Sequence, residues 1–374
     1  MDALFAAAGQ FKPQGKVIHI REFGNGNINS TFLVTFSLES EREGEREKHF
    51  ILQRVNTRVF RRPELVMQNM RVATGHLLRR LERAPFIRKK GLRRWEVPIV
   101  LLTGEGLDHW VDPEGSFWRA LSFIEGARTF DSIRDAGHAR EVGCALGIFH
   151  MLLGDLPPET LADTLEGFHI TPRYLAHYEK VLAQYGAPKS PEANYCLRFV
   201  SGRTALAHIL EKAKAEGRLF LRPIHGDPKV NNILIDTATG QSIGIIDLDT
   251  VKPGLLHYDI GDCLRSGANP MGEDSPEWEK VRFDADLCRA ILDGYFSTAG
   301  GSLTANDFEY LYDSMRLIAF ELGLRFFTDY LEGNVYFKVK SPEHNLLRAL
   351  VQFRLVESIE SQERAIRAII GEAR

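Results

Sequence analysis

Hydrophobic and polar residues alternate in several short segments near the start of the chain. In residues 31–36, TFLVTF, the side chains of Phe32, Val34 and Phe36 fall on one side, which is the spacing of a half-buried strand. Residues 64–81 instead have the spacing of an amphipathic helix. Further segments of strand character are residues 50–55, 96–102 and 117–124. The first part of the chain is therefore predicted to consist of strands with one helix.

The pattern changes beyond Gly126. Residues 138–153, HAREVGCALGIFHMLL, carry apolar side chains at helical intervals, and most later segments are helical in the same way. Two short apolar segments, residues 233–235 and 242–247, are predicted to be strands. We therefore expect an α+β protein with a small antiparallel-sheet lobe, a hinge and a larger, mainly helical lobe. Their expected bounds are residues 1–122, 123–126 and 127–374.

A dense group of polar residues, HGDPKVNN at 225–232, precedes the first of these two late strands. Two antiparallel strands joined by a tight turn bring their outer ends together. Asn232, just before the first strand, and Asp247, at the end of the second, are therefore predicted to face one small volume. Asp227 lies in the loop that leads into it.

These three side chains have the chemistry that phosphoryl transfer needs. A carboxylate and an amide oxygen, from Asp247 and Asn232, suit Mg²⁺ bound together with substrate phosphates. A separate carboxylate, that of Asp227, can accept a proton from an attacking hydroxyl. The protein's work in such a reaction is mostly positioning and charge neutralisation. Asp249 is a further candidate ligand for the metal or the phosphates.

The spacing of the three residues resembles the catalytic loop and metal-binding Asp of protein kinases. With HGD in place of HRD and IDLD in place of DFG, the chain is more similar to the aminoglycoside phosphotransferase and choline kinase superfamily. This resemblance implies a protein-kinase-like bilobal fold, ATP as co-substrate, Mg²⁺ as cofactor and Asp227 as catalytic base. It gives His225 and Asp259 structural roles, although Asp259 is also a candidate helix N-cap.

The small lobe contains candidates for nucleotide binding. FGNGNINSTFLV suggests a glycine-rich turn over the ATP phosphates, although Asn-Gly is also a common hairpin turn. The turn residues are Gly24, Asn25, Gly26 and Asn27.

Arg54 is the candidate basic group for the phosphates, but Gln53 points to the opposite face, so this assignment depends on the phase of the strand. The centre of the following helix offers Arg54 no acidic partner. Phe123 and Glu125 lie in the expected hinge, whose backbone would bind adenine.

Several segments are similar to the bacterial N-acetylhexosamine 1-kinases, which phosphorylate N-acetylglucosamine or N-acetylgalactosamine at the anomeric hydroxyl. They include HGDPKVNNILID, IIDLDTVKPG and LRFFTDYLEGNVYFKV, and the resemblance covers roughly residues 20 to 360. It implies that Asp227, Arg325 and Tyr336 hold the sugar, and it makes His169, in GFHITPR, a further candidate. Arg325 also interrupts an apolar run, where a guanidinium needs a partner.

Charge and composition help to weigh other acceptors and partners. An aminoglycoside is a polycation, whereas residues 301–374 hold 11 acidic and 9 basic residues, and no dense aromatic cluster suggests a choline cage. A neutral sugar fits best, with another small alcohol or amino-alcohol kinase, or a non-catalytic kinase-like protein, as alternatives. The net charge of -3 argues against nucleic acid as a partner, and no apolar run approaches the roughly 18 residues of a membrane span.

The cysteines and the N-terminus bear on the compartment. Four widely spaced cysteines without a C-x-x-C pair argue for free thiols in a reducing cytosol. The first residues, MDALFAAAGQF, have neither a basic nor a sustained apolar segment, so no signal peptide is expected. We expect a cytoplasmic protein, as a monomer or a homodimer.

Overall fold

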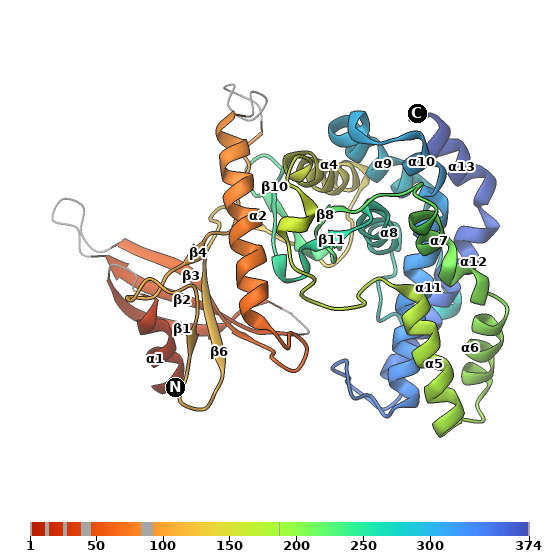
Figure 1. The fold of residues 1–374 in the computed structure, drawn as a ribbon, viewed down its shortest axis with the longest axis horizontal. Coiled ribbons are helices and arrows are strands. Elements are labelled where there is room, and N and C mark those ends of the chain that lie inside the picture. Colours follow the sequence, from red (N-terminus) through yellow and green to blue (C-terminus); the bar gives the residue numbers. More distant parts are fainter. Residues whose placement is uncertain are drawn as a thin grey trace.

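The structure, a computed structural model, describes residues 2–11, 15–24, 28–38, 46–83, 93–186 and 188–372. It has a sheet-rich N-terminal part and a larger helical part (Figure 1). The elements of the N-terminal part are α1 (Asp2–Gln10), β1 (Lys16–Glu22), β2 (Ser30–Leu38), β3 (Arg46–Val55), α2 (Pro63–Arg83), β4 (Val100–Leu101), β5 (Trp110–Val111) and β6 (Phe117–Ser122). The predicted two-lobed α+β fold is confirmed.

One antiparallel sheet organises the N-terminal part. Its strands follow the order β1-β2-β3-β6-β4, and β5 also pairs with β6. Of the strand predicted at 96–102, only Val100 and Leu101 pair in the sheet. The prediction of a single helix was wrong, because α1 is rich in alanine and shows no clear alternation of polar and apolar positions.

The two faces of this sheet are chemically different. Phe50 and Leu52 of β3 pack in a small core on the outer face with Ala7 and Ala8 of α1 and with Phe11, which follows α1. Successive strand residues point to opposite faces, so Ile51 and Gln53 face the other way, and Ile51 packs against the main core. This alternation decides which β3 side chains can reach the helical part.

The helical part contains most of the chain. Its helices are α4 (Ala136–Leu153), α5 (Thr171–Tyr185), α6 (Pro191–Ser201), α7 (Ile209–Ala215), α8 (Leu256–Gly267), α9 (Ala285–Ala299), α10 (Ala305–Glu309), α11 (Leu311–Leu331), α12 (His344–Ser361) and α13 (Glu363–Glu372). Its strands are β7 (Ala127–Arg128), β8 (Arg222–Ile224), β9 (Ile233–Asp236), β10 (Ser242–Ile245) and β11 (Lys252–Gly254), which form sheets β10-β9-β7 and β11-β8. β9 and β10 are the two strands predicted from the sequence.

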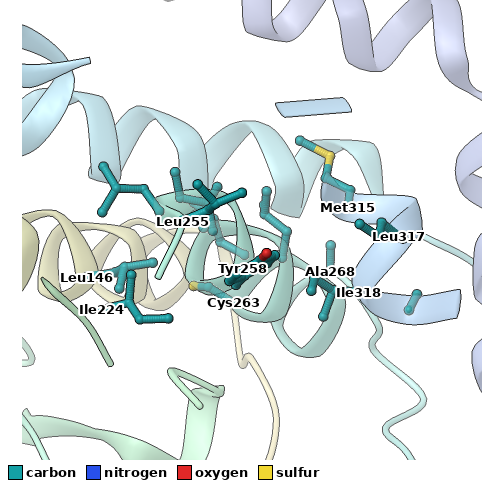
Figure 2. Close-up of a cluster of buried hydrophobic side chains, with 14 of the residues drawn as sticks. Leu146, Ile224, Leu255, Tyr258, Cys263, Ala268, Met315, Leu317 and Ile318 are labelled. Carbon is teal, nitrogen blue, oxygen red and sulfur yellow. The ribbon is translucent and has the colours of Figure 1, made fainter. Parts of the chain in front are cut away.

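The main core lies where α4, α8 and α11 meet. Figure 2 shows Leu146 of α4, Ile224 of β8, Tyr258 and Cys263 of α8 and Met315 of α11 among the side chains of this core. The same core includes Met70, Ala73 and Leu77 of α2, the helix that lies between the sheet and the helical part (Figure 1). The two parts therefore share packed surface. In the part of the chain that the structure describes, no helix is long and apolar enough to cross a membrane.

Two glycines allow α4 and α9 to approach closely. A Cβ atom on Gly143 of α4 would lie 1.9 Å from the carbonyl oxygen of Ile291, and one on Gly294 of α9 would lie 2.0 Å from that of Arg140. Backbone atoms cannot move aside without displacing a helix. The core around these helices therefore depends on the absence of side chains at both positions.

We predict that Gly143→Ala lowers the free energy of unfolding by about 1–3 kcal/mol, the usual cost of overpacking. Gly9→Ala is the matched control, because nothing lies within 4 Å of a Cβ at that position of α1. There alanine should stabilise the helix slightly. Thermal unfolding of both variants checks this, and a Gly143→Ala variant as stable as the wild type would contradict the close approach of α4 and α9.

Candidate active site

The loop between β8 and β9 carries Asp227 and is anchored by a buried carboxylate. Asp259 of α8 accepts hydrogen bonds from the backbone N–H groups of His225 (2.7 Å) and Gly226 (2.8 Å). A ring nitrogen of His150 lies 2.9 Å from the same carboxylate. Burial alone would raise the pKa of Asp259, but His150 and His225 hold it below its ordinary value. α8 begins at Leu256, so Asp259 anchors the loop and is not the N-cap of its helix.

His225 connects this loop to the strand that leads to Asp247. Its Nε2–H donates to the carbonyl of Ile246 (2.9 Å), and its Nδ1 accepts from the N–H of Asp227 (3.2 Å). Burial lowers the pKa of His225, which agrees with a neutral ring that donates on one side and accepts on the other. Both residues of the predicted structural pair, His225 and Asp259, thus make hydrogen bonds within the loop that carries Asp227.

The structure brings Asp227, Asn232 and Asp247 together. Asn232 donates from its side-chain Nδ2 to the backbone carbonyl of Asp227 (2.8 Å). The backbone carbonyl of Asn232 accepts from the N–H of Ile246 (2.9 Å). Asp247 comes directly after Ile246 and has a left-handed backbone conformation (φ 66°, ψ 54°). This conformation is uncommon for residues other than glycine, and residues that adopt it are often found at functional sites. Among the described residues, none donates a hydrogen bond to the Asp247 side chain.

The charges around Asp247 favour a cation. Its enclosure by protein and the negative charge of Asp249 raise the pKa of the Asp247 carboxyl. Asp247 is nevertheless open to solvent on one side. Asp247 and the Oδ1 of Asn232 are oxygen donors of the kind that Mg²⁺ prefers. These two residues therefore fit the predicted metal site.

Lys229 is a site residue that the sequence reasoning missed. Its ammonium lies 2.6 Å from the carboxylate of Asp227. Burial would lower the pKa of Lys229, but Asp227 and Asp247 raise it, so the lysine is a cation close to both carboxylates. Its place two positions after Asp227 in HGDPK was the available signal.

The carboxylate of Asp249 makes its contacts with the N-terminal part. Its carboxylate lies 2.5 Å from a guanidinium nitrogen of Arg119 on β6, and Asn29 donates to its other oxygen (2.6 Å). The carboxylate of Asp249 is thus committed to a buried ion pair with the N-terminal part. A ligand role for Asp249 would require it to leave both partners.

The strand phase assumed for Arg54 was wrong. Arg54 lies on the outer face of the sheet, exposed and with its guanidinium 5.9 Å from the ring of Trp118. Gln53 and Arg119 are paired across β3 and β6 and face the helical part. Alternation along the strand therefore turns Arg54 away from Asp247. Arg119 is the cation that the sequence reasoning missed, because only the strand pairing shows where it points.

The candidate nucleotide residues are only partly described. Asn25, Gly26 and Asn27 lie outside the described residues. The ring of Phe23, next to Gly24, lies 5.9 Å from that of Phe123, edge to face. The start of the glycine-rich segment thus lies beside the expected hinge. The carbonyl of Glu125 accepts from Arg94 (3.1 Å), and its side chain is exposed.

Arg325 of α11 lies among aromatic rings. Its guanidinium carbon is 5.0–5.9 Å from the ring centres of four residues, which are Phe168, Tyr174, Tyr336 and Phe337. Burial would lower the pKa of Arg325, but Tyr174, Tyr336, Glu321 and Asp227 raise it. The negative charge of Asp227 therefore acts on the guanidinium of Arg325. Within the described ranges, no residue accepts a hydrogen bond from this guanidinium.

The loop that carries Tyr336 is held by one buried side chain. The carboxylate of Asp329 accepts hydrogen bonds from the backbone N–H groups of Val335, Tyr336 and Phe337 (2.7–3.0 Å) and from Asn345. These bonds hold Tyr336 next to Arg325, the other residue of this region that the resemblance assigns to the sugar.

His169 is not free to bind a substrate, so that prediction was wrong. One ring nitrogen donates to the carbonyl of Gly226 (2.8 Å) and the other contacts Glu321 of α11 (2.9 Å). Burial would lower the pKa of His169, but Glu321 raises it above its ordinary value. The charged ring thus ties α11, one turn before Arg325, to the residue preceding Asp227. Glu321 gave no signal in the sequence, because only the folded chain places it beside His169.

A two-lobed fold with a buried anchor beneath an Asp-containing loop, and with an Asn and a second Asp beside it, is an arrangement suited to phosphoryl transfer. Residues 19–300 match the family model of the phosphotransferase enzyme family, which is more than half of the chain. The chain belongs to this family. The predictions of the superfamily and of a phosphotransferase with an alcohol acceptor are thereby confirmed.

Solved structures of several such enzymes share the fold. A microcompartment-associated aminopropanol kinase is 18% identical, with a TM-score of 0.58 and coverage of 94% of this chain and 95% of that one. An aminoglycoside phosphotransferase from Alicyclobacillus acidocaldarius subsp. acidocaldarius DSM 446 is 13% identical, with a TM-score of 0.57 and coverage of 98% of this chain and 94% of that one. A choline/ethanolamine kinase family protein from Mesorhizobium loti is 16% identical, with a TM-score of 0.56 and coverage of 100% of this chain and 99% of that one. At these identities the likeness shows the fold alone.

We predict that Asp259→Asn lowers the free energy of unfolding by about 3–5 kcal/mol, because it removes one partner of a buried charged cluster. The amide would also place donors against the N–H groups of His225 and Gly226. Chemical denaturation at neutral pH measures the loss. Asp293→Asn, on the exposed side of α9, is the control and should leave stability unchanged.

The pH dependence has a definite sign. The pKa of Asp259 is lower in the folded chain than in the unfolded chain, so its stabilisation is complete above roughly pH 4 and is lost as the pH falls through the folded value. The difference between wild type and Asp259→Asn should therefore shrink on acidification. A difference that grows at low pH would contradict the anchoring role.

Proposed function

We propose that the protein transfers the γ-phosphate of ATP to the anomeric hydroxyl of an N-acetylhexosamine, with Mg²⁺ as cofactor. The observation that carries the choice of acceptor is the guanidinium of Arg325, which lies among four aromatic rings near Asp227 without an acidic partner among the described residues. The similarity of the sequence to N-acetylhexosamine 1-kinases supports the same reading.

The charge of Arg325 weighs against cationic acceptors. Choline, aminopropanol and aminoglycosides carry positive charge, and two like charges about 4 Å apart repel by several kcal/mol in a partly buried site. A neutral sugar brings hydroxyl and carbonyl oxygens that can accept from the guanidinium. The faces of Tyr336 and Phe337 offer apolar surface for the sugar ring and an acetyl methyl group.

Asp227 would act as the base. An aspartate in this position accepts the proton of the attacking hydroxyl, and holding that hydroxyl in line with the phosphate provides much of the rate. Lys229, 2.6 Å from Asp227, can neutralise charge on the transferred phosphoryl group. Asp247 and Asn232 would hold Mg²⁺, which neutralises charge on the phosphates.

The test is a kinase assay with ATP and Mg²⁺ against free sugars, aminoglycosides, choline and ethanolamine. We expect turnover with N-acetylglucosamine or N-acetylgalactosamine and a product whose phosphate is acid-labile and located at position 1 by ³¹P NMR. Phosphate at position 6, or turnover of another alcohol and of neither sugar, would leave the phosphotransferase standing and overturn the substrate.

We predict that Asp227→Asn reduces kcat by about 10²–10⁴, the usual contribution of a general base, with the low end applying if the residue mainly orients the hydroxyl. The substitution keeps the shape of the side chain, so thermal unfolding should be close to wild type. A kcat near that of the wild type would remove Asp227 from the proposed mechanism.

We predict that Arg325→Ala raises the KM of the sugar by roughly 10- to 150-fold, the worth of one charge-assisted hydrogen bond, with little change in the KM of ATP. Arg316→Ala on the same helix is the control, because Arg316 pairs with Asp313 and Glu360 instead of facing the acceptor region. Equal effects on the KM values of sugar and ATP would contradict the proposed role of Arg325.

A further inference from the structure

A buried ion pair joins the sheet to the segment that follows Asp247. Arg119 on β6 is only 1% exposed, and its guanidinium Nη2 lies 2.5 Å from the carboxylate of Asp249, which is 3% exposed. Gln53 on β3 accepts a hydrogen bond from Arg119 Nε (2.9 Å). Arg119 and Gln53 belong to the N-terminal part and Asp249 to the helical part, so the pair connects the two.

Asp249 is also fixed from a second side. Asn29 donates to its Oδ2 (2.6 Å), and the Oδ1 of Asn29 accepts from the N–H of Asn56 (2.9 Å). Asn29 lies between Gly24 and the strand β2, at the end of the glycine-rich segment. One carboxylate therefore positions both Arg119 and the end of that segment.

Arg119 has hydrogen-bonding capacity left over. Its Nη1 is buried and has no partner among the residues that the structure describes. A guanidinium carries five N–H donors, and a buried donor without an acceptor is costly. Arg119 is also among the groups whose charge acts on Asp247. The ion-pair partner of Arg119, Asp249, is two positions after Asp247 in the chain, which links the unused donor to the carboxylate proposed to hold Mg²⁺ and the phosphates.

We propose that Arg119 binds the phosphates of the nucleotide and that Asp249 orients it for this task. In protein kinases a lysine on β3 does this, paired with a glutamate of the following helix. Here β3 presents Gln53, and the following helix α2 presents Asn69, which donates to two backbone carbonyls. The cation and its acidic partner have therefore moved to β6 and to the segment after Asp247.

This arrangement has a consequence that the kinase pair lacks. The acid lies in the helical part and the cation in the sheet, so the phosphate-binding cation is in place only when the two parts are together. The planar fork of arginine can contact a phosphate in bidentate fashion, which a lysine cannot do. The proposal rests on the phosphotransferase activity but not on the identity of the acceptor.

Nucleotide binding without any acceptor tests it. Wild type, Arg119→Gln and Arg54→Gln are titrated by calorimetry with ADP and MgCl₂, and separately with adenosine, which lacks phosphate. Arg54 is the matched control, since it lies opposite Trp118, the neighbour of Arg119, on the outer face of the same strand pair. We expect Arg119→Gln to weaken ADP roughly 10- to 150-fold and to leave adenosine unchanged, and Arg54→Gln to change neither.

Equal weakening of ADP and adenosine would show that Arg119 only holds the two parts together, and unchanged ADP binding would show that it does not contact phosphate. Either result overturns the proposal. Arg119→Lys keeps the charge without the fork, and its ADP affinity should fall between wild type and Arg119→Gln. It also provides the measurement if the glutamine variant fails to fold. If the wild type binds neither ADP nor adenosine, the result contradicts an adenine nucleotide as the phosphate donor and therefore the proposed function on which this inference rests.

The role of Asp249 is tested by combining variants. If Asp249 acts through Arg119, then adding Asp249→Asn to Arg119→Gln should cause no further loss of ADP affinity. A further loss of the size seen for Asp249→Asn alone would mean that Asp249 contributes independently, as a metal ligand would, and would overturn its orienting role.

Discussion

The carboxylate of Asp259 is the interaction on which the site depends. It lies at full burial in the main core, where an unpaired negative charge is prohibitively costly. The backbone N–H groups of His225 and Gly226 and the ring of His150 satisfy it. That requirement fixes the backbone immediately before Asp227, and the core packed around α8 in turn fixes Asp259. Asp227, the proposed base, thus follows a backbone segment that is anchored in the main core.

Charges from separate elements then meet at this loop. His169 connects the carbonyl of Gly226 to Glu321 on α11, one helical turn from Arg325. The catalytic loop and the helix of the proposed acceptor site are therefore held by one chain of contacts. On the other side, the pair of Arg119 and Asp249 connects the loop region to the sheet. The proposed donor and acceptor regions are thus connected by buried charges to the segments around Asp247 and Asp227.

The sequence predicted what depends on local spacing. Asp227, Asn232 and Asp247 were placed correctly, since a loop and a short hairpin determine their proximity. What failed depends on pairing between distant segments. Arg54 was chosen over its neighbours without knowledge of the strand phase, and Arg119 could be recognised only once β6 was paired with β3. The resemblance made His169 a candidate substrate ligand, and nothing in the nearby sequence indicated its partner Glu321, which lies 152 positions away. Alanine-rich α1 lacked the polar alternation that marks a surface helix.

The central claim is that the proposed acceptor site takes a neutral N-acetylated sugar at the guanidinium of Arg325, which has no ion-pair partner among the described residues. The most direct measurement compares kcat/KM for N-acetylglucosamine with that for glucosamine, which differs by the loss of the acetyl group and the gain of a positive charge. The account predicts that N-acetylglucosamine is preferred by at least about tenfold, since a cation near Arg325 is repelled. Equal or better use of glucosamine would contradict it.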